Sequence, residues 1–417
     1  MPAPATAPHL AAGVRQSSRV VAVGAVVLVT LDLDLVDALT TAIVVPLALL
    51  PVWWSATRRF VGARTLLALV ALALVAGLWL SAHASATHTV NPTYVREHVL
   101  LVAGGFAAVG TLLWARTVLP VRAVALAAAG GLLMRLALTP VNPANPWKYN
   151  YSYAVTVLAL ALVIRRRPRP AEVVILLGLA VVCTLNDSRS AFATLVLAAL
   201  LVAWQLRPRT LGRHANAVTT IALFGGVAAC VYTVGTTLIL EGYLGESTQQ
   251  RSVEQLETSG SLLLGGRPEW GATAALVAER PHGYGIGVRA GPHDVLVAKT
   301  GMSSLHYDPH NGYVENYMFG GEIKLHAVVA DLWSRHGVAG VLLSAWLLGL
   351  AVWSLASATA RRVASGLTIY LTCLMLWNFA FGPIQSSMPI LVLALGLLLL
   401  PRAGVDAGHA TLEERPA

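Results

Sequence analysis

Three arginines stand where a guanidinium group could bind phosphate. Arg189 lies in the polar turn 186–190 between two apolar segments. Arg267 follows two glycines and precedes an expected helix start at Pro268, and helix starts favour anions. Arg135 lies inside the outer end of an apolar segment, where a functional role is the default hypothesis. Arginine suits phosphate because its planar fork of donors stays charged even when it is desolvated.

Each arginine also has a simpler structural explanation. Arg189 would pair with Asp187 across the turn, and Gly-Arg-Pro turns like that of Arg267 are common on ordinary loops. Arg135 would extend toward lipid headgroups, as long cationic side chains do.

A histidine-rich segment runs from His306 through His310 and Asn311 to His326 and His336. Histidine is the natural general base near neutral pH, so this segment could accept a proton. His306, Asp308 and His310 alternate, which also raises a metal site, although such spacing on a proline-containing loop is weak evidence. The simpler explanation is that these histidines only hydrogen-bond within their loop.

Asp32 and Asp34 form an Asp-x-Asp pair near the start of the chain. They resemble the acidic pair of metal-dependent polyprenyl-phosphate-sugar transferases. Residues two apart do not share a helix face, so we prefer the interpretation that they end a helical hairpin.

The elements that must position these residues are membrane-spanning helices. Hydrophobic residues make up 56% of the 417 residues and charged residues 12%, whereas soluble domains average about 25% charged residues. Apolar runs recur that are long enough to cross a hydrocarbon core of about 30 Å. The weak alternation over about ten residues that is typical of transmembrane barrels is missing. The sequence therefore predicts an all-α, polytopic transmembrane helix bundle.

Twelve spans are expected along the chain. They cover residues 20–36, 38–56, 65–82, 98–115, 119–138, 150–164, 171–186, 190–206, 217–240, 337–358, 364–382 and 388–401.

The arginine clusters predict how the chain is oriented in the membrane. The net charge is +9, and most of the arginines fall in short clusters that follow the even-numbered spans. The positive-inside rule places these clusters, and with them both termini, in the cytoplasm. The same rule puts the long connection 241–336 outside, where a loop of this length is usually functional or disordered. We expect it to be ordered, with short helices at 269–279 and 326–335, and call it the cap.

The expected domains follow from these spans. They are a cytoplasmic tail 1–19, spans one to nine within 20–240, the extracytoplasmic cap 241–336, spans ten to twelve within 337–401 and a cytoplasmic tail 402–417. The three cysteines lie in separate spans without paired spacing and are interpreted as packing residues.

The order of several short motifs resembles that of the O-antigen ligase and polymerase family. These motifs are Ser188-Arg189, Gly266-Arg267 with Trp270, the glycine-rich turn 279–287 that begins Glu-Arg-Pro and stands where the family has roughly Pro-x-x-Gly-x-Gly, and a histidine followed by a helix that closes on Gly337-Val338-Ala339-Gly340. The resemblance covers residues 180–355, and its specificity comes from the combination.

The resemblance leaves two candidates for the catalytic histidine. His310-Asn311 is the literal His-Asn pair, but the helix that follows does not enter a membrane. His326 has the family's spacing to the membrane entry at Gly337, although its neighbour is Ala327. We favour His326, expect it at the outer surface above the bilayer, keep His310 beside it, and regard Asn311 as a residue that orients the acceptor.

The resemblance implies a GT-C-like membrane glycosyltransferase of the bacterial cytoplasmic membrane, active on its outer face. It implies transfer of a glycan from a polyprenyl diphosphate donor to an acceptor hydroxyl on a glycan, lipid or wall polymer, with inversion and without a metal or other cofactor. Arg267, Arg189 and Arg135 would hold the diphosphate. Ligase and polymerase share these motifs, and no nucleotide-binding loop or nucleic-acid partner is indicated.

Two other functions remain open. A lipid-linked glycan transporter or flippase would suit twelve spans by analogy of fold. The absence of a clear repeat and the crowding of polar residues at the outer edge argue against it. The other is a metal-dependent polyprenyl-phosphate-sugar transferase that uses Asp32 and Asp34.

Overall fold

The protein is an all-α helical bundle with a smaller helical unit at one end. The computed structural model describes residues 7–164, 170–207, 216–243, 245–259, 267–308 and 310–402. It is 78% helical. The strands of the described part form one short hairpin, β1 (Asp34–Val36) and β2 (Leu39–Thr40). The predicted all-α class is therefore confirmed.

Six helices are long and apolar enough to cross a membrane, and a bent pair would make a seventh. The six are α4 (Ala63–Ala84), α5 (Pro92–Val118), α6 (Val121–Leu138), α9 (Arg189–Leu206), α10 (Ala217–Leu240) and α15 (Val328–Ala360). The bent pair is α2 (Thr41–Ala48) and α3 (Leu50–Ala56). The remaining bundle helices are α1 (Ala7–Leu31), α7 (Ser152–Val163), α8 (Pro170–Leu185), α16 (Gly366–Phe381) and α17 (Ile384–Leu398).

The first two expected spans differ from the structure. α1 starts at Ala7, within the expected tail, and ends at Leu31 rather than at residue 36. Asp32 has a left-handed backbone, with φ of 48°, and the hairpin follows it. The second span is bent by 74° between α2 and α3. Proline explains the break, because Pro46 lies inside α2 and another proline lies in the first turn of α3.

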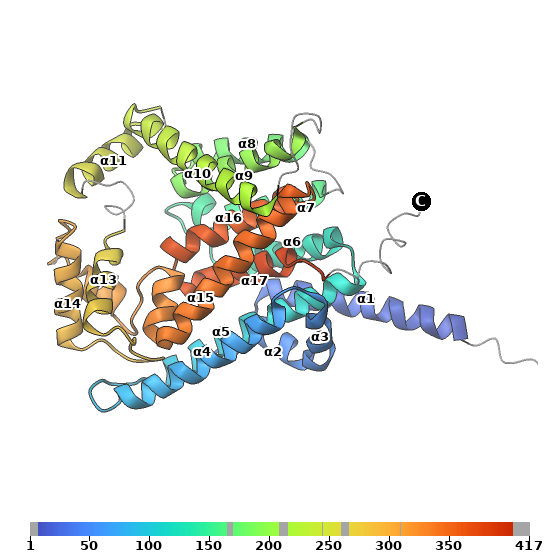
Figure 1. The fold of residues 1–417 in the computed structure, drawn as a ribbon, viewed down its shortest axis with the longest axis horizontal. Coiled ribbons are helices and arrows are strands. Elements are labelled where there is room, and N and C mark those ends of the chain that lie inside the picture. The colour runs from blue at the N-terminus through green and yellow to red at the C-terminus, as the bar shows by residue number, and fades with distance from the viewer. Residues whose placement is uncertain are drawn as a thin grey trace, which may run out of the picture.

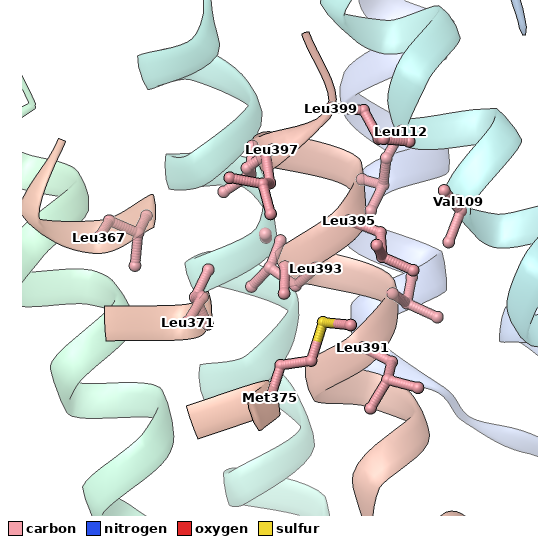
Figure 2. Packing of buried hydrophobic residues seen from close by; sticks show 14 of the residues in the cluster. Val109, Leu112, Leu367, Leu371, Met375, Leu391, Leu393, Leu395, Leu397 and Leu399 are labelled. Carbon is pink, nitrogen blue, oxygen red and sulfur yellow. The ribbon is translucent and has the colours of Figure 1, made fainter. Parts of the chain in front are cut away.

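The bundle core is built from closely packed aliphatic side chains. Figure 2 shows Leu391, Leu393 and Leu395 of α17 packed between α16 and α5. Small residues allow close contacts elsewhere, as at Gly110 of α5, where a Cβ would collide with the Trp53 ring. Such small residues are typical of helix packing in membranes, because they let backbones approach.

The described part of the cap has a hydrophobic cluster of its own. Its helices are α11 (Glu246–Ser259), α13 (Glu269–Glu279) and α14 (Pro292–Ser303), and Figure 1 places α13 and α14 at the opposite end of the molecule from α1. Tyr284, Met302 and Met318 are buried in the cluster to which α13 and α14 contribute. The expected helix 269–279 coincides with α13, so the prediction of order is confirmed for this segment.

The glycine turn of the cap is pressed against the bundle. Gly283, Gly285 and Gly287 all have positive φ. A Cβ on Gly285 would lie 2.5 Å from the Ser81 backbone N, and one on Gly283 would lie 2.6 Å from the Trp333 carbonyl oxygen. Glycine is required at these positions both for the left-handed backbone and for the close approach. The turn motif thus fixes the cap against α4 and α15.

The segment that follows His326 is helical but is not at the surface. α15 begins at Val328 and changes direction at Gly337, whose φ is 59° and ψ is −139°. Every residue from Ala330 to Gly337 is buried, and His326 is only 7% exposed, so the expectation that His326 lies at the surface is wrong. A Cβ on Gly337 would collide with the His282 carbonyl, and one on Gly340 with the Leu332 carbonyl. The Gly-x-x-Gly motif therefore makes the bend possible.

Candidate functional site

His326 occupies a constrained turn directly before α15. Its backbone is left-handed, with φ of 55°, and the residue is only 7% exposed. The ring stacks on Tyr317 with 4.5 Å between ring centroids and 12° between planes. Its Nδ1 is buried and has no hydrogen-bond partner among the described residues. Unpartnered buried polar atoms are uncommon in folded proteins and often mark a functional group.

Three tyrosines form a row that leads to this histidine. The ring centroids of Tyr307 and Tyr313 lie 5.7 Å apart, and those of Tyr313 and Tyr317 lie 4.9 Å apart. The Tyr313 hydroxyl donates a 2.6 Å hydrogen bond to Glu269 Oε1. Burial, together with the Glu269 carboxylate, raises the pKa of Tyr313, so the phenol remains a donor at neutral pH. The row thus connects α13 to the histidine.

Glu269 is the first residue of α13 and is 4% exposed. Its position in the first turn suits a carboxylate, because the helix dipole favours negative charge there. Its second oxygen, Oε2, is buried without a partner in the described part of the chain.

Burial and nearby charges set the protonation of His326. Burial lowers its pKa below the usual value, the carboxylates of Glu269 and Asp331 raise it, the guanidinium of Arg267 lowers it, and a hydrogen bond with the Lys324 backbone raises it. The net direction is downward, so the imidazole is neutral at pH 7. Within the described ranges the Arg267 side chain has no ion pair with a carboxylate. The site therefore combines a neutral base, a buried carboxylate and an available cation.

His310 and Asn311 lie in a different environment. Both are exposed. The His310 backbone N–H donates to Asp308 Oδ1 at 2.8 Å, and the Tyr313 backbone N–H donates to Asn311 Oδ1 at 3.0 Å. Asn311 thus stabilises the start of the turn that carries Tyr313. No group of three His, Cys, Asp or Glu side chains that could hold a metal occurs in the described part of the chain.

The other two arginines have partners elsewhere. Arg189 Nη1 donates to Ser252 Oγ at 2.8 Å, which ties the start of α9 to α11. Arg135 Nη1 lies 2.6 Å from Asp32 Oδ2, so this charge is paired rather than extended to lipid headgroups. Asp34 is exposed in β1. Of the three arginines, Arg267 is the one whose charge acts on His326 in the described structure.

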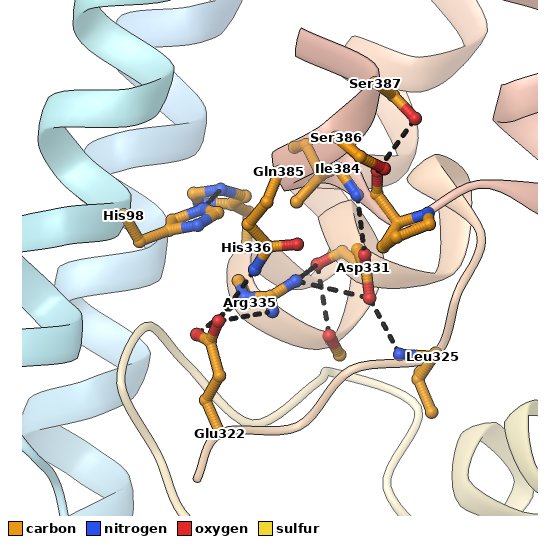
Figure 3. A network of polar contacts seen from close by, with 12 residues as sticks. His98, Glu322, Leu325, Asp331, Arg335, His336, Ile384, Gln385, Ser386 and Ser387 are labelled. Carbon is orange, nitrogen blue, oxygen red and sulfur yellow. Dashed lines mark hydrogen bonds and ion pairs between the residues drawn. The ribbon is translucent and has the colours of Figure 1, made fainter. Parts of the chain in front are cut away.

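A buried polar network links Leu325, the residue directly before His326, to the start of α17, and Figure 3 shows it around Asp331. Asp331 accepts hydrogen bonds from the backbone N–H groups of Leu325 at 2.8 Å and Ile384 at 3.0 Å. Arg335 lies 3.3 Å from both Asp331 and Glu322.

Sequence reasoning missed the roles of Glu269, Tyr313 and Glu322. Arg335 could have indicated that a carboxylate lies nearby, because it is a cation at the entry of an apolar span and such a charge needs a partner. That rule alone does not identify which carboxylate it is.

The chain was compared with protein-family models, with curated proteins and with solved structures, and none of them matches it.

Proposed function

We propose that this membrane protein transfers a glycan from a polyprenyl diphosphate to an acceptor hydroxyl, with His326 as the general base. The observation that carries the proposal is the unpartnered Nδ1 of a buried, neutral His326 beside Arg267 and Glu269. A neutral imidazole can take a proton from an attacking hydroxyl. The nearby guanidinium can stabilise an anionic leaving group.

The proposed reaction is a single displacement at the anomeric carbon. The acceptor O–H bond breaks as its proton passes to His326, and the oxygen forms the new bond to the sugar carbon. The bond from that carbon to the diphosphate oxygen breaks on the opposite face, which gives inversion. Arg267 balances the charge that develops on the diphosphate. Glu269 favours the protonated imidazole that forms, because its carboxylate raises the His326 pKa.

The proposal includes an orientation in the membrane. We propose twelve spans, with both termini in the cytoplasm and the cap outside. The bent pair, the four shorter apolar helices and α7 correspond to the expected spans that the six long helices do not cover. The arginine clusters that follow the even-numbered spans support a cytoplasmic location for those connections.

The decisive experiment complements a deletion strain with single variants and analyses its surface glycans by gel electrophoresis. We expect His326→Ala and Arg267→Ala to abolish transfer while the protein still reaches the membrane, as checked by immunoblot. His310→Ala serves as the control and should retain activity, because the His310 side chain is exposed. Near-normal transfer by His326→Ala together with loss in His310→Ala would assign the base to His310. Activity in both variants would contradict a histidine base.

The glycans of the deletion strain also separate ligase from polymerase. Loss of linkage to the acceptor indicates a ligase, whereas shortened chains indicate a polymerase. Purified protein that moves lipid-linked glycan across vesicles without changing its length or acceptor would instead support a flippase.

A further inference from the structure

A short backbone contact joins the start of α4 to the end of α17. Phe60 forms an isolated antiparallel bridge with Pro401. Next to it, the Arg402 N–H donates a 2.8 Å hydrogen bond to the Arg59 carbonyl. Side chains alternate between the two faces of an extended chain, so Arg59 and Arg402 lie on one face of this bridge and Phe60 and Pro401 lie on the other.

The face that carries Phe60 is turned toward the bundle. Phe60 is 4% exposed, and the Arg116 guanidinium carbon lies 5.0 Å from its ring centroid. Arg116 also donates to the carbonyl oxygens of Gly396 and Leu399, each at 2.9 Å, at the C-terminal end of α17. These contacts hold the bridge in place, so the opposite face has a fixed position.

That opposite face concentrates positive charge. Arg59 and Arg402 are both exposed, and the Cβ atoms of residues that face each other in an antiparallel pair lie about 4.5–5.5 Å apart. Arg58 is exposed next to them, and Arg64 lies in the first turn of α4. We call these four residues the arginine cluster.

The arginine cluster has no counter-charge from the protein. In the described part of the chain none of its four guanidinium groups is paired with a carboxylate, whereas Arg96, Arg135 and Arg335 all are. Like charges directly opposite each other destabilise a strand pair. An anion that binds between Arg59 and Arg402 would remove this repulsion, which indicates an anionic ligand.

Apolar side chains beside the cluster favour an amphiphile over a soluble anion. The Arg64 guanidinium carbon lies 5.6 Å from the ring centroid of Trp54, which is exposed on α3. Leu50 and Val52 of the same helix are exposed as well. The bend of 74° means that α2 and α3 cannot both follow the membrane normal. An inclined helix with an exposed tryptophan suits the boundary between lipid headgroups and acyl chains.

We propose that the arginine cluster binds the phosphate of an anionic phospholipid. The guanidinium groups of Arg59 and Arg402 donate to the phosphate oxygens, which match their planar fork of donors. The acyl chains lie along the exposed apolar side chains of α3. In the proposed orientation the cluster is cytoplasmic, where anionic lipids attract basic segments. This inference does not depend on glycan transfer at His326.

Native mass spectrometry of the full-length protein measures this binding directly. Detergent-solubilised protein is titrated with dioleoyl phosphatidylglycerol, and dioleoyl phosphatidylcholine, which has the same chains and no net charge, is the comparison. We expect the first phosphatidylglycerol to bind about tenfold more tightly than phosphatidylcholine. Inorganic phosphate at millimolar concentration should not displace it, because it lacks the acyl chains.

Two variants assign the binding to the cluster. Arg59→Gln and Arg402→Gln should each weaken phosphatidylglycerol binding about fivefold and leave phosphatidylcholine binding unchanged. Both side chains are exposed, and the hydrogen bond between these residues uses backbone atoms only, so the variants should fold. Arg361→Gln is the matched control, because it removes one exposed charge from a different connection.

Four outcomes would overturn the proposal. Equal binding of the two lipids would show that the phosphate charge is not recognised. Native affinity in both cluster variants would place the lipid elsewhere. An equal loss in Arg361→Gln would mean that only the total surface charge attracts the lipid. Full displacement by inorganic phosphate would show a site for a free anion instead.

Discussion

The carboxylate of Asp331 accepts a 2.8 Å hydrogen bond from the backbone N–H of Leu325, the residue directly before His326. The same side chain is completely buried, lies 3.3 Å from Arg335 Nη1 and raises the pKa of His326 through its charge. One carboxylate thus fixes the backbone of the proposed base and adjusts its protonation.

We expect Asp331→Asn to lower the His326 pKa further, because it removes a negative charge that raises this pKa. The acidic limb of the pH–activity profile should therefore move to lower pH. The variant should also lose about 1–3 kcal/mol of stability, since an amide cannot accept from both backbone N–H groups. Kinetics across pH and thermal unfolding in nanodiscs measure the two effects. Asp308→Asn, an exposed change in the cap, is the control.

The native protein should retain activity at pH values below about 6.5, the usual pKa of histidine. Because burial lowers the His326 pKa, the neutral base persists until the pH falls through that lowered value. The stability that His326 contributes is present above the unfolded pKa and is lost over the same acidic range. Initial rates between pH 4.5 and pH 8 test this, and a rate that already falls between pH 8 and pH 7 would contradict it.

Tyr313→Phe should destabilise the cap by about 1–3 kcal/mol, because it leaves the buried Glu269 carboxylate without its phenolic donor. The effect should appear as faster limited proteolysis of residues 241–336. The control is Tyr307→Phe, since the Tyr307 hydroxyl has no hydrogen bond within the described structure. Equal proteolysis of the two variants would show that the Tyr313 hydrogen bond is not important for the cap.

Gly337→Ala should disrupt the junction between cap and bundle. Its φ is 59°, and the added methyl group would collide with the His282 carbonyl. Left-handed backbone at a non-glycine residue costs of order 1–3 kcal/mol even without a collision. Gly349→Ala, in the same helix with nothing within 4 Å of the new Cβ, should be neutral. Thermal unfolding of both variants gives the comparison.

The sequence predicted the elements that depend on local patterns. α13 was predicted at 269–279 because the polar residues that bound a helix and its apolar face are local signals. Six of the expected spans correspond to helices that are long and apolar enough to cross a membrane, and long apolar runs predicted them. His326 is 7% exposed and His310 is exposed, and the preference for His326 as the base stays a prediction.

Pairings between distant residues could not be predicted in this way. Arg135 and Asp32 are 103 positions apart, and His98 and His336 are 238 apart. Each residue alone signals only that a polar partner is needed inside an apolar environment. The partner of each residue depends on how the helices pack, and local patterns in a single sequence do not predict that packing.

The second hydrogen bond of Asp331, to the backbone of Ile384, joins the His326 turn to the first residue of α17. The position of the proposed base is thus fixed relative to a helix of the bundle and not relative to the outer surface of the cap. A change in bilayer thickness that shifts α17 would carry the base with it. In the proposed reaction, the acceptor hydroxyl would therefore have to reach a position that the protein fixes relative to α17.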